Sequence, residues 1–234
     1  MAGIRYLTPW LLICLLLLLA PVTSSAGESA GERDLTAAIQ EQYQSIQSFR
    51  TQFTQELINA SSQDSEVREG WIVYERPRRI HWETVSPEKE ILILNRESVW
   101  DYFPAEGVAY RYSLRQMFDS KTMLRFISGE VDLSKEFHVR QLDSSSKNTE
   151  LIRLELTPKD PDPSLVEAEI KVDPERMLIK RIKLIDFFGN KNILRFQNIE
   201  LNCQPEEELF LLEPPEDTRI VDKTREGAPS GGTE

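Results

Sequence analysis

The chain has 234 residues, of which 40% are hydrophobic and 29% are charged. This length fits one domain or at most two, and the composition is too apolar and too aromatic for a disordered chain. The net charge of -11 argues against a protein that binds nucleic acid, because phosphate contacts need clustered Lys and Arg. Two cysteines are too few for a scaffold held together by disulfides.

Residues 1–26 are predicted to form a secretory signal peptide. Arg5 precedes an uninterrupted apolar run of 11 residues, 10–20, and a small residue, Ala26, ends the segment. The run is shorter than the about 20 residues that a helix needs to cross a bilayer. Cleavage after Ala26 would leave 208 residues with a net charge of -12, exported to the periplasm. The alternative is a short membrane anchor that is never cleaved.

The two cysteines have different predicted fates. Cys14 lies inside the apolar run and follows Ile13, whereas a lipidation site needs a small residue before its cysteine. We therefore expect no lipid anchor on this chain. Cys203 would be the single cysteine of the exported protein, without an internal disulfide, and we expect it to be a small buried residue.

The exported part is predicted to be one domain, 27–224, that opens with an amphipathic helix. Asp34 can cap this helix. Its apolar residues recur at the helical period, and they are Leu35, Ala38, Ile39, Tyr43, Ile46 and Phe49.

After the helix, apolar and polar residues alternate with a period of two, which predicts strands. The clearest case is 166–172, where apolar and charged residues alternate without exception, as in a sheet with one buried face. The predicted strands are 49–57, 68–76, 79–85, 89–94, 99–103, 108–112, 136–143, 150–157, 165–173, 178–187, 191–202 and 209–213.

The connections between these strands indicate a mostly antiparallel sheet. The segments 143–149 and 158–163 are turns, and none of the C-terminal connections is long enough for the helix of a parallel crossover. Helical spacing over 114–128 predicts one or two short helices, ended by Gly129. Residues 225–234 are rich in Gly, Pro and Ser and are predicted to be a disordered tail.

No pattern in the chain nominates a catalytic residue, a metal site or a cofactor. His81 and His138 both lie in predicted strands, and neither has a second His, a Cys or a carboxylate at ligand spacing. Nucleophile-elbow, zinc-protease and phosphate-loop motifs are missing from the sequence. The residues therefore favour a binding protein, although composition alone leaves an enzyme open.

Residues 70–104 carry the most distinctive pattern. A glycine-led strand runs from Gly70 to Arg76-Pro77, the next strand includes Trp82, and 99–104 reads Val-Trp-Asp-Tyr-Phe-Pro. This order and spacing resemble the periplasmic lipoprotein carrier family, LolA. Residues 123–139 resemble that family's lid helix and following strand, and 210–222 resembles its C-terminal ending, so the resemblance covers nearly the whole exported chain.

The sequence departs from the family pattern at two places. Ile80 stands where Phe is usual, and 95–98 replaces the usual Asp-Gly turn. Neither change threatens the fold, but the shape of the binding cavity near Ile80 is expected to differ.

The resemblance implies a fold that is mainly β with α: an incomplete antiparallel β-barrel of about 11 strands, with a helical lid over a hydrophobic cavity. It implies a monomeric periplasmic carrier without a cofactor. Such a carrier takes triacylated lipoproteins from an inner-membrane ABC transporter and passes them to an outer-membrane acceptor. A chain of roughly 15 carbons resists entering water by about 10 kcal/mol or more, so transit needs a protein cover. Because the carrier must also release its cargo, we expect an apolar cavity with few hydrogen bonds.

Arg76 is the residue that the resemblance marks as a lock. In the family, the matching arginine holds the empty cavity shut by bonding to backbone carbonyls of the lid, a role that suits the five donors of a guanidinium. The alternative is a solvated arginine at a strand end beside Pro77. The cavity lining is predicted to be apolar, with plain core packing as the alternative for each residue: Phe53, Ile80, Trp82, Leu92, Trp100, Leu124, Phe126 and Ile127.

Two other functions stay open at this point. One is a lipid-binding or lipoprotein-sensing module of the same fold, of the envelope-stress regulator type. Such proteins often carry a second domain, for which 208 residues leave no room. The other is a secreted hydrolase, which would need Asp, Glu and His converging inside the half-barrel, and the apolar strand faces argue against that.

Overall fold

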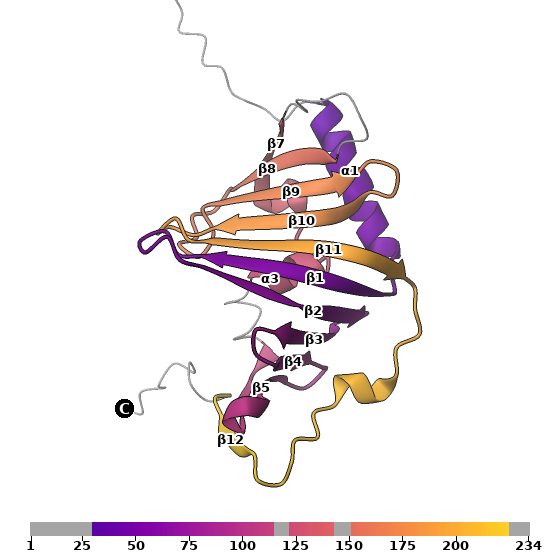
Figure 1. Ribbon diagram of the computed structural model, residues 1–234. Helices are drawn as coiled ribbons and strands as arrows, with labels where there is room; N and C mark the ends of the chain where they lie inside the picture. Colours follow the sequence, from indigo (N-terminus) through magenta and orange to yellow (C-terminus); the bar gives the residue numbers. More distant parts are fainter. Residues whose placement is uncertain (1–29, 115–121, 143–150, 225–234) are drawn as a thin grey trace, which may run out of the picture.

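One sheet of twelve strands forms the body of the protein (Figure 1). The computed structural model describes residues 30–114, 122–142 and 151–224. The predicted signal peptide, the predicted turn at 143–149 and the predicted tail lie outside these ranges. The described elements are α1 (Ala30–Ser45), β1 (Ser48–Ile58), β2 (Ser65–Glu75), β3 (Arg79–Ser86), β4 (Glu90–Leu94), β5 (Val99–Phe103), η1 (Pro104–Glu106), β6 (Val108–Tyr112), α3 (Thr122–Ile127), α4 (Leu133–Glu136), β7 (Phe137–Leu142), β8 (Ile152–Pro158), β9 (Glu167–Asp173), β10 (Leu178–Ile185), β11 (Lys191–Leu201), η2 (Glu207–Phe210) and β12 (Arg219–Asp222).

The sheet is open, because its two edge strands do not pair with each other. The strand order is β12-β6-β5-β4-β3-β2-β1-β11-β10-β9-β8-β7. Every pair in this order is antiparallel except β12 with β6, which is parallel. The predicted fold class, a mainly β protein built on an incomplete antiparallel barrel, is confirmed.

The C-terminal strand was predicted at the wrong place. Residues 209–213 form no strand, and the short helix η2 stands there instead, while β12 was not predicted. Phe210 is buried against the convex side of β3 and β4. The segment cannot pair with these strands, because their backbone groups already bond to neighbouring strands of the sheet. Two polar contacts fix the segment, from the His81 ring to the Leu209 carbonyl at 2.6 Å and from the Asn95 amide to the Phe210 carbonyl at 3.3 Å.

The helices also differ in detail from the prediction. Helix α1 ends at Ser45, so Ile46 and Phe49 lie beyond it and Phe49 belongs to β1. Helix α3 ends two residues before Gly129, whose positive φ of 68° is the left-handed conformation expected after a helix. Helix α4 was not predicted, and it is capped by Asp132, whose carboxylate accepts a hydrogen bond from the Lys135 amide at 3.0 Å.

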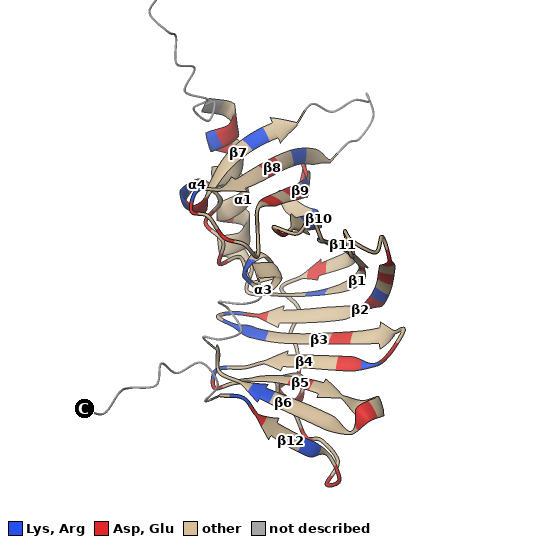
Figure 2. Cartoon of the chain, turned by 90° about the vertical axis from the view of Figure 1, so that its left-hand side faces the viewer, with Lys and Arg blue, Asp and Glu red and all other residues tan. Residues whose placement is uncertain are grey.

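The helices cover one face of the sheet, here called the concave face (Figure 2). Residues directly opposite on neighbouring strands share a face, and Trp82 lies opposite both Ile72 and Leu92. Ile39 of α1 and Leu124 of α3 join these strands in one hydrophobic core. Among the described residues, no helix is both long enough and apolar enough to cross a membrane.

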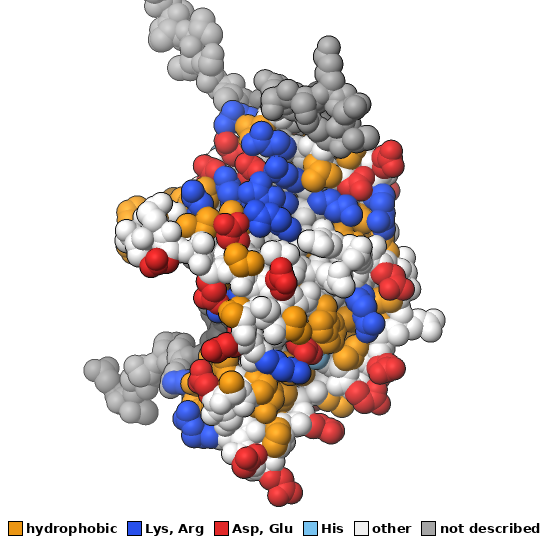
Figure 3. Space-filling model, in the orientation of Figure 1, with side chains coloured by type: hydrophobic (Ala, Val, Ile, Leu, Met, Phe, Trp, Pro, Cys, Tyr) orange, Lys and Arg blue, Asp and Glu red, His pale blue; other side chains and the backbone are white. Residues whose placement is uncertain are grey.

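The opposite, convex face is charged over β8 to β11 (Figure 3). Arg153, Lys171, Arg181 and Arg195 are successive cross-strand partners there and form a row of four cations. We call these four residues the cationic row.

One buried carboxylate lies beside this row. Glu169 is 3.3 Å from Arg153, 3.3 Å from Arg181 and 3.6 Å from Lys183. Burial would raise the pKa of Glu169, but Lys183, Arg153 and Arg181 outweigh it and lower that pKa below its usual value. Glu169 is therefore ionised in the folded protein and binds three strands together.

Candidate functional site

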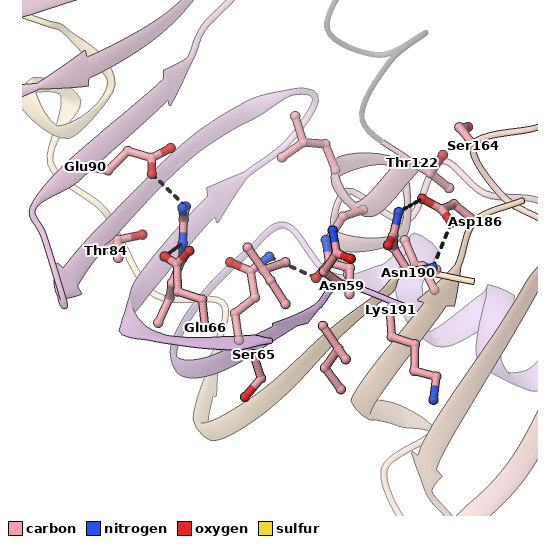
Figure 4. Close-up of a pocket in the computed structure, with 18 of the residues that line it drawn as sticks. Asn59, Ser65, Glu66, Thr84, Glu90, Thr122, Ser164, Asp186, Asn190 and Lys191 are labelled. Carbon is pink, nitrogen blue, oxygen red and sulfur yellow. Dashed lines mark hydrogen bonds and ion pairs between the residues drawn. The ribbon is translucent and has the colours of Figure 1, made fainter. Parts of the chain in front are cut away.

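A cavity of ≈ 680 Å³ opens on the concave face, at the end of the sheet where β1 turns into β2 and β10 into β11 (Figure 4). Its apolar lining comes from β1, β3, β4, β10 and α3: Leu57, Ile58, Trp82, Leu92, Met123, Leu124 and Leu184. This volume lies within the range of about 300–1,000 Å³ that is usual for sites of small ligands.

The mouth of the cavity is polar, which differs from the expected wholly apolar lining. The Arg68 guanidinium lies 2.6 Å from a Glu66 carboxylate oxygen and 2.9 Å from a Glu90 carboxylate oxygen. Partial burial would lower the pKa of Arg68, but the hydrogen bond to Glu66 and the charge of Glu90 raise it, so the guanidinium keeps its charge. Deeper in, the Gln55 amide donates to Asn192 Oδ1 at 2.9 Å. The polar groups at the mouth thus satisfy one another.

A glycine allows the core to pack against a cavity residue, Trp82. A Cβ at Gly70 would collide with the Glu83 carbonyl of β3 and with the Phe53 ring. The missing side chain lets Phe53 lie across Gly70, its cross-strand partner, and meet Trp82 edge-on at 5.1 Å between ring centroids. The glycine that leads the predicted motif is therefore a packing requirement.

Helices α1 and α3 cover the concave face over β1, β10 and β11. The gap between them and the sheet, lined by Tyr43, Phe126 and Ile127 among others, is only ≈ 20 Å³. The Tyr43 hydroxyl accepts a hydrogen bond from the Ile179 amide of β10 at 3.2 Å, and burial raises the pKa of Tyr43 far above its usual value. Gly129 packs closely on the same tyrosine, since a Cβ there would stand 3.2 Å from Tyr43 Cδ1. The helical cover is thus tightly seated.

Arg76 fastens this cover at the end of the sheet away from the cavity. Its Nη2 donates to the Tyr43 carbonyl at 2.7 Å and its Nε donates to the Ile46 carbonyl at 2.9 Å. These carbonyls belong to the last turn of α1 and to the residue that follows it, where unpaired carbonyls attract a cation. The sequence-based expectation named the lid helix at 123–129, whereas the bonded carbonyls are those of α1.

A second arginine of the same turn holds the other side of the cover. Arg78 forms an ion pair with Glu130, which lies shortly after α3. Because the Arg78 side chain is 54% exposed, this pair is screened by water and salt. The β2–β3 turn therefore contacts the end of α1 through Arg76 and the segment that follows α3 through Arg78. No signal in the sequence pointed to the Arg78 contact beyond the clustering of arginines.

Seven of the eight predicted lining residues are distributed over three environments. Trp82, Leu92 and Leu124 line the cavity, and Phe126 and Ile127 line the narrow gap under α1. Phe53 and Ile80 are in the core, exposed by 2% and 0%. The gap and core residues could reach a ligand only after the helical cover moves.

Trp100 lies on the wrong face for the predicted role. It is the cross-strand partner of Ile93 and Arg111, whereas Leu92 of the cavity lies opposite Asp101. Its ring faces the convex side, where the Arg111 guanidinium lies 5.5 Å from the ring centroid. Alternation places Val99 and Asp101 on the concave face instead.

Sequence reasoning missed several residues of the site. Leu57 and Leu184 continue strand faces that already point inward at Phe53 and Ile182, so the period of two could have found them. Ile58 is out of that period and lines the cavity as the last residue of β1. The charged mouth had no such signal, because Glu66, Arg68 and Glu90 read as ordinary solvent-facing residues.

His81 and Cys203 stand outside the cavity. The His81 ring stacks on Trp71 on the convex face, with 4.4 Å between centroids. Cys203 is a free, half-buried thiol, rather than the fully buried residue that was expected. The described part of the chain contains no group of three or more His, Cys, Asp or Glu that could hold a metal ion.

An open half-barrel with an apolar concave face, a hollow and a helical cover defines a binding protein for apolar ligands. Residues 44–213 match the family described as "Outer membrane lipoprotein carrier protein LolA", and the chain belongs to that family. It is a binding and transport family of periplasmic proteins.

Individual relatives agree with this assignment at modest identity. The chain is 26% identical over 220 residues to an outer-membrane lipoprotein carrier protein of Chromohalobacter salexigens, covering 93% of this chain and 97% of the relative. It is 27% identical over 199 residues to the protein of the same name from Bordetella avium, covering 85% and 89%. A crystal structure of an uncharacterised conserved protein from Thermus thermophilus has the same fold, with a TM-score of 0.54 and 10% identity over 82% of this chain and 99% of that one.

Proposed function

We propose that this protein is a monomeric periplasmic carrier that binds the acyl chains of triacylated lipoproteins released from the inner membrane and delivers them to the outer membrane. Its partners are then an inner-membrane ABC transporter and an outer-membrane acceptor. Membership of the LolA family supports this role above a lipoprotein-sensing regulator or a secreted hydrolase. The N-terminal segment 1–26 serves as the cleaved export signal in this proposal.

The observation that carries the proposal is an apolar concave face under a helical cover. The cover is fastened at its end by polar contacts, Arg76 to the carbonyls of Tyr43 and Ile46. Beside the cover, Trp82 and Leu124 line the cavity. Three acyl chains exceed the ligands that fit a cavity of this size, so cargo enters the hollow and then displaces α1 and α3 from the sheet.

Arg76 acts as the lock in this sequence of events. In the empty carrier its two hydrogen bonds favour the closed state, and acyl chains replace the apolar contacts of the helices when the cover lifts. Each buried CH₂ contributes about 0.8 kcal/mol, so long chains supply enough free energy to break two hydrogen bonds. Because apolar contacts have no fixed direction, an acceptor with a more favourable cavity can take the chains away.

The binding test compares one lipoprotein with and without its acyl chains. Native mass spectrometry of the carrier purified from periplasm is expected to show a one-to-one complex with the triacylated form and none with the deacylated form. Two variants provide a matched pair, since Trp82 and Trp100 are both half-buried tryptophans on opposite faces of the sheet. Trp82→Ala should weaken the complex and Trp100→Ala should leave it unchanged; equal binding of the deacylated lipoprotein would reject the proposal.

A further inference from the structure

Exposed apolar side chains gather at the end of the sheet where the cavity opens. Five of the seven large hydrophobic residues that are exposed in the described ranges lie there, at or next to the turns of that end. They are Val67, Val85, Val166, Phe187 and Phe188. Figure 1 shows the β1–β2 and β10–β11 turns extending together at this end, and Figure 3 shows the projection with hydrophobic side chains at its edge.

Two phenylalanines form the tip of the β10–β11 turn. Phe187 is 71% exposed and Phe188 is 75% exposed, with their rings edge-on at 5.6 Å. The turn beneath them is fixed by its own hydrogen bonds, because Asp186 Oδ1 accepts from the amides of Phe188 and Asn190, both at 2.9 Å. The Phe187 amide also donates to the Pro163 carbonyl at 3.0 Å. The two rings are therefore held out in water by an ordered turn.

The tip is continuous with the mouth of the cavity. Asp186, Asn190 and Lys191, which flank the two phenylalanines, all line the cavity and are labelled in Figure 4. Asn190 also joins the neighbouring turn, since its Oδ1 accepts from the Ala60 amide at 3.0 Å. A flat surface that met this end of the molecule would touch the rings and face the cavity at the same time.

We propose that Phe187 and Phe188 insert into the interface of a lipid bilayer and hold the mouth of the cavity against the membrane. The inference rests on the proposed carrier function, in which acyl chains leave one membrane and enter another. A bilayer fits better than a protein groove, because the two exposed rings stand at the tip of one projecting turn and belong to no broad contiguous apolar patch, and such a tip can enter the headgroup region of a membrane. When the tip is inserted, acyl chains can pass between the bilayer and the cavity while little of their apolar surface is exposed to water.

The charge of the protein makes this contact weak and selective. The chain has a net charge of -11, and the cavity lining holds four carboxylates, Asp64, Glu66, Glu90 and Asp186, against two cations, Arg68 and Lys191. Anionic lipid headgroups therefore repel this end, and a zwitterionic surface is preferred. Two rings give an association no stronger than the about 10⁴ M⁻¹ of one myristoyl chain, which suits a protein that must leave the membrane again.

The test measures flotation of the periplasm-purified protein with phosphatidylcholine vesicles. The double variant Phe187→Ser and Phe188→Ser removes the tip. Its matched control, Leu211→Ser and Ile220→Ser, removes two other residues that are exposed by 56% and 55% but lie on the C-terminal segment. We expect wild type and control to bind vesicles equally, and the tip variant to bind about ten-fold more weakly for each ring removed. Adding anionic lipid should weaken binding of the wild type.

Three results would overturn the inference. They are no vesicle binding by the wild type, equal binding by the tip variant, and binding that rises with anionic lipid through the cationic row. Loss of transporter or acceptor binding by the tip variant, without vesicle binding by the wild type, would assign the tip to a protein partner instead. The tip variant should still form the one-to-one lipoprotein complex, so failure of the carrier function and failure of the membrane contact are separately visible.

Discussion

Replacing Arg76 by Leu tests the proposed lock most sharply among single substitutions. The change removes a charged donor from the carbonyls of Tyr43 and Ile46, at 2.7 and 2.9 Å, and leaves the apolar stem of the side chain in place. A hydrogen bond from a charged group contributes about 1.5–3 kcal/mol, and the half-buried position calls for the lower end. Two such bonds give about 3 kcal/mol, which is about a hundred-fold in the ratio of open to closed cover.

Hydrogen exchange of the backbone amides in α1 and α3 reports this ratio directly. In Arg76→Leu, exchange in both helices should speed up by about two orders of magnitude, while the central strands β1 and β11 change much less. Arg96→Leu is the control, because it removes the same charge from an exposed turn between β4 and β5. The exchange rates in Arg76→Lys should lie between those of the wild type and those of Arg76→Leu, since one ammonium group cannot bond to both carbonyls as the guanidinium does. If α1 in Arg76→Leu exchanged as slowly as in the Arg96 control, the lock would be wrong.

Three further predictions concern the seating of the cover and of the sheet. Gly129→Ala should lower the free energy of unfolding, measured by urea denaturation, by about 1–3 kcal/mol, because the φ of this residue is 68° and the new methyl group crowds Tyr43 of α1. Gly31→Ala is the control and should not destabilise the protein, because a Cβ at Gly31 has open space around it. Arg78→Gln should raise exchange in α3 slightly at low salt and not at 1 M salt, and an effect that persisted in salt would contradict the screened ion pair. Glu169→Gln should destabilise at neutral pH. The deficit should begin to shrink as the pH falls below the usual carboxyl pKa of 4.5 and should vanish below the lowered pKa of Glu169 in the folded protein, since that carboxylate stabilises the folded state only while it is ionised. A deficit that was independent of pH would show that packing, not charge, is responsible.

Alternation of apolar and charged residues was a sufficient guide for most of the sheet. It worked at β9, where Ala168, Ile170 and Val172 are fully buried on one face. It misplaced Trp100, because Val99-Trp100-Asp101-Tyr102 has large residues in both registers and the larger apolar side chain turned out to face the convex side. The face of such a strand depends on its neighbours, which one segment of sequence does not contain.

The C-terminal segment shows a second limit. An apolar stretch around Phe210 was read as a strand, but its burial comes from covering the outer face of β3 and β4 rather than from pairing. The four-residue β12 pairs in parallel with β6, more than a hundred positions earlier in the chain, and has no period long enough to detect. Both features are set by long-range contacts.

The candidate site was only partly visible in the sequence for a related reason. A family pattern pointed to Arg76, but its partners are backbone carbonyls of α1, and a carbonyl carries no residue-type signal. The polar mouth around Arg68 was missed because charged residues at the end of a strand normally face water. Arg68 and its two carboxylate partners prove to lie at a cavity only when the pairing of β2 and β4 with β3 is known.

Photo-crosslinking at two tryptophan positions tests the central claim, that acyl chains occupy the concave side. A benzophenone amino acid would replace Trp82, which lines the cavity, or Trp100, which lies on the convex face. Each carrier would be loaded with one lipoprotein carrying radiolabelled acyl chains and then irradiated. We expect the acyl label to attach at position 82 and to be at background at position 100. Labelling at position 100 alone, or at both positions equally, would contradict a carrier that shelters acyl chains inside its half-barrel.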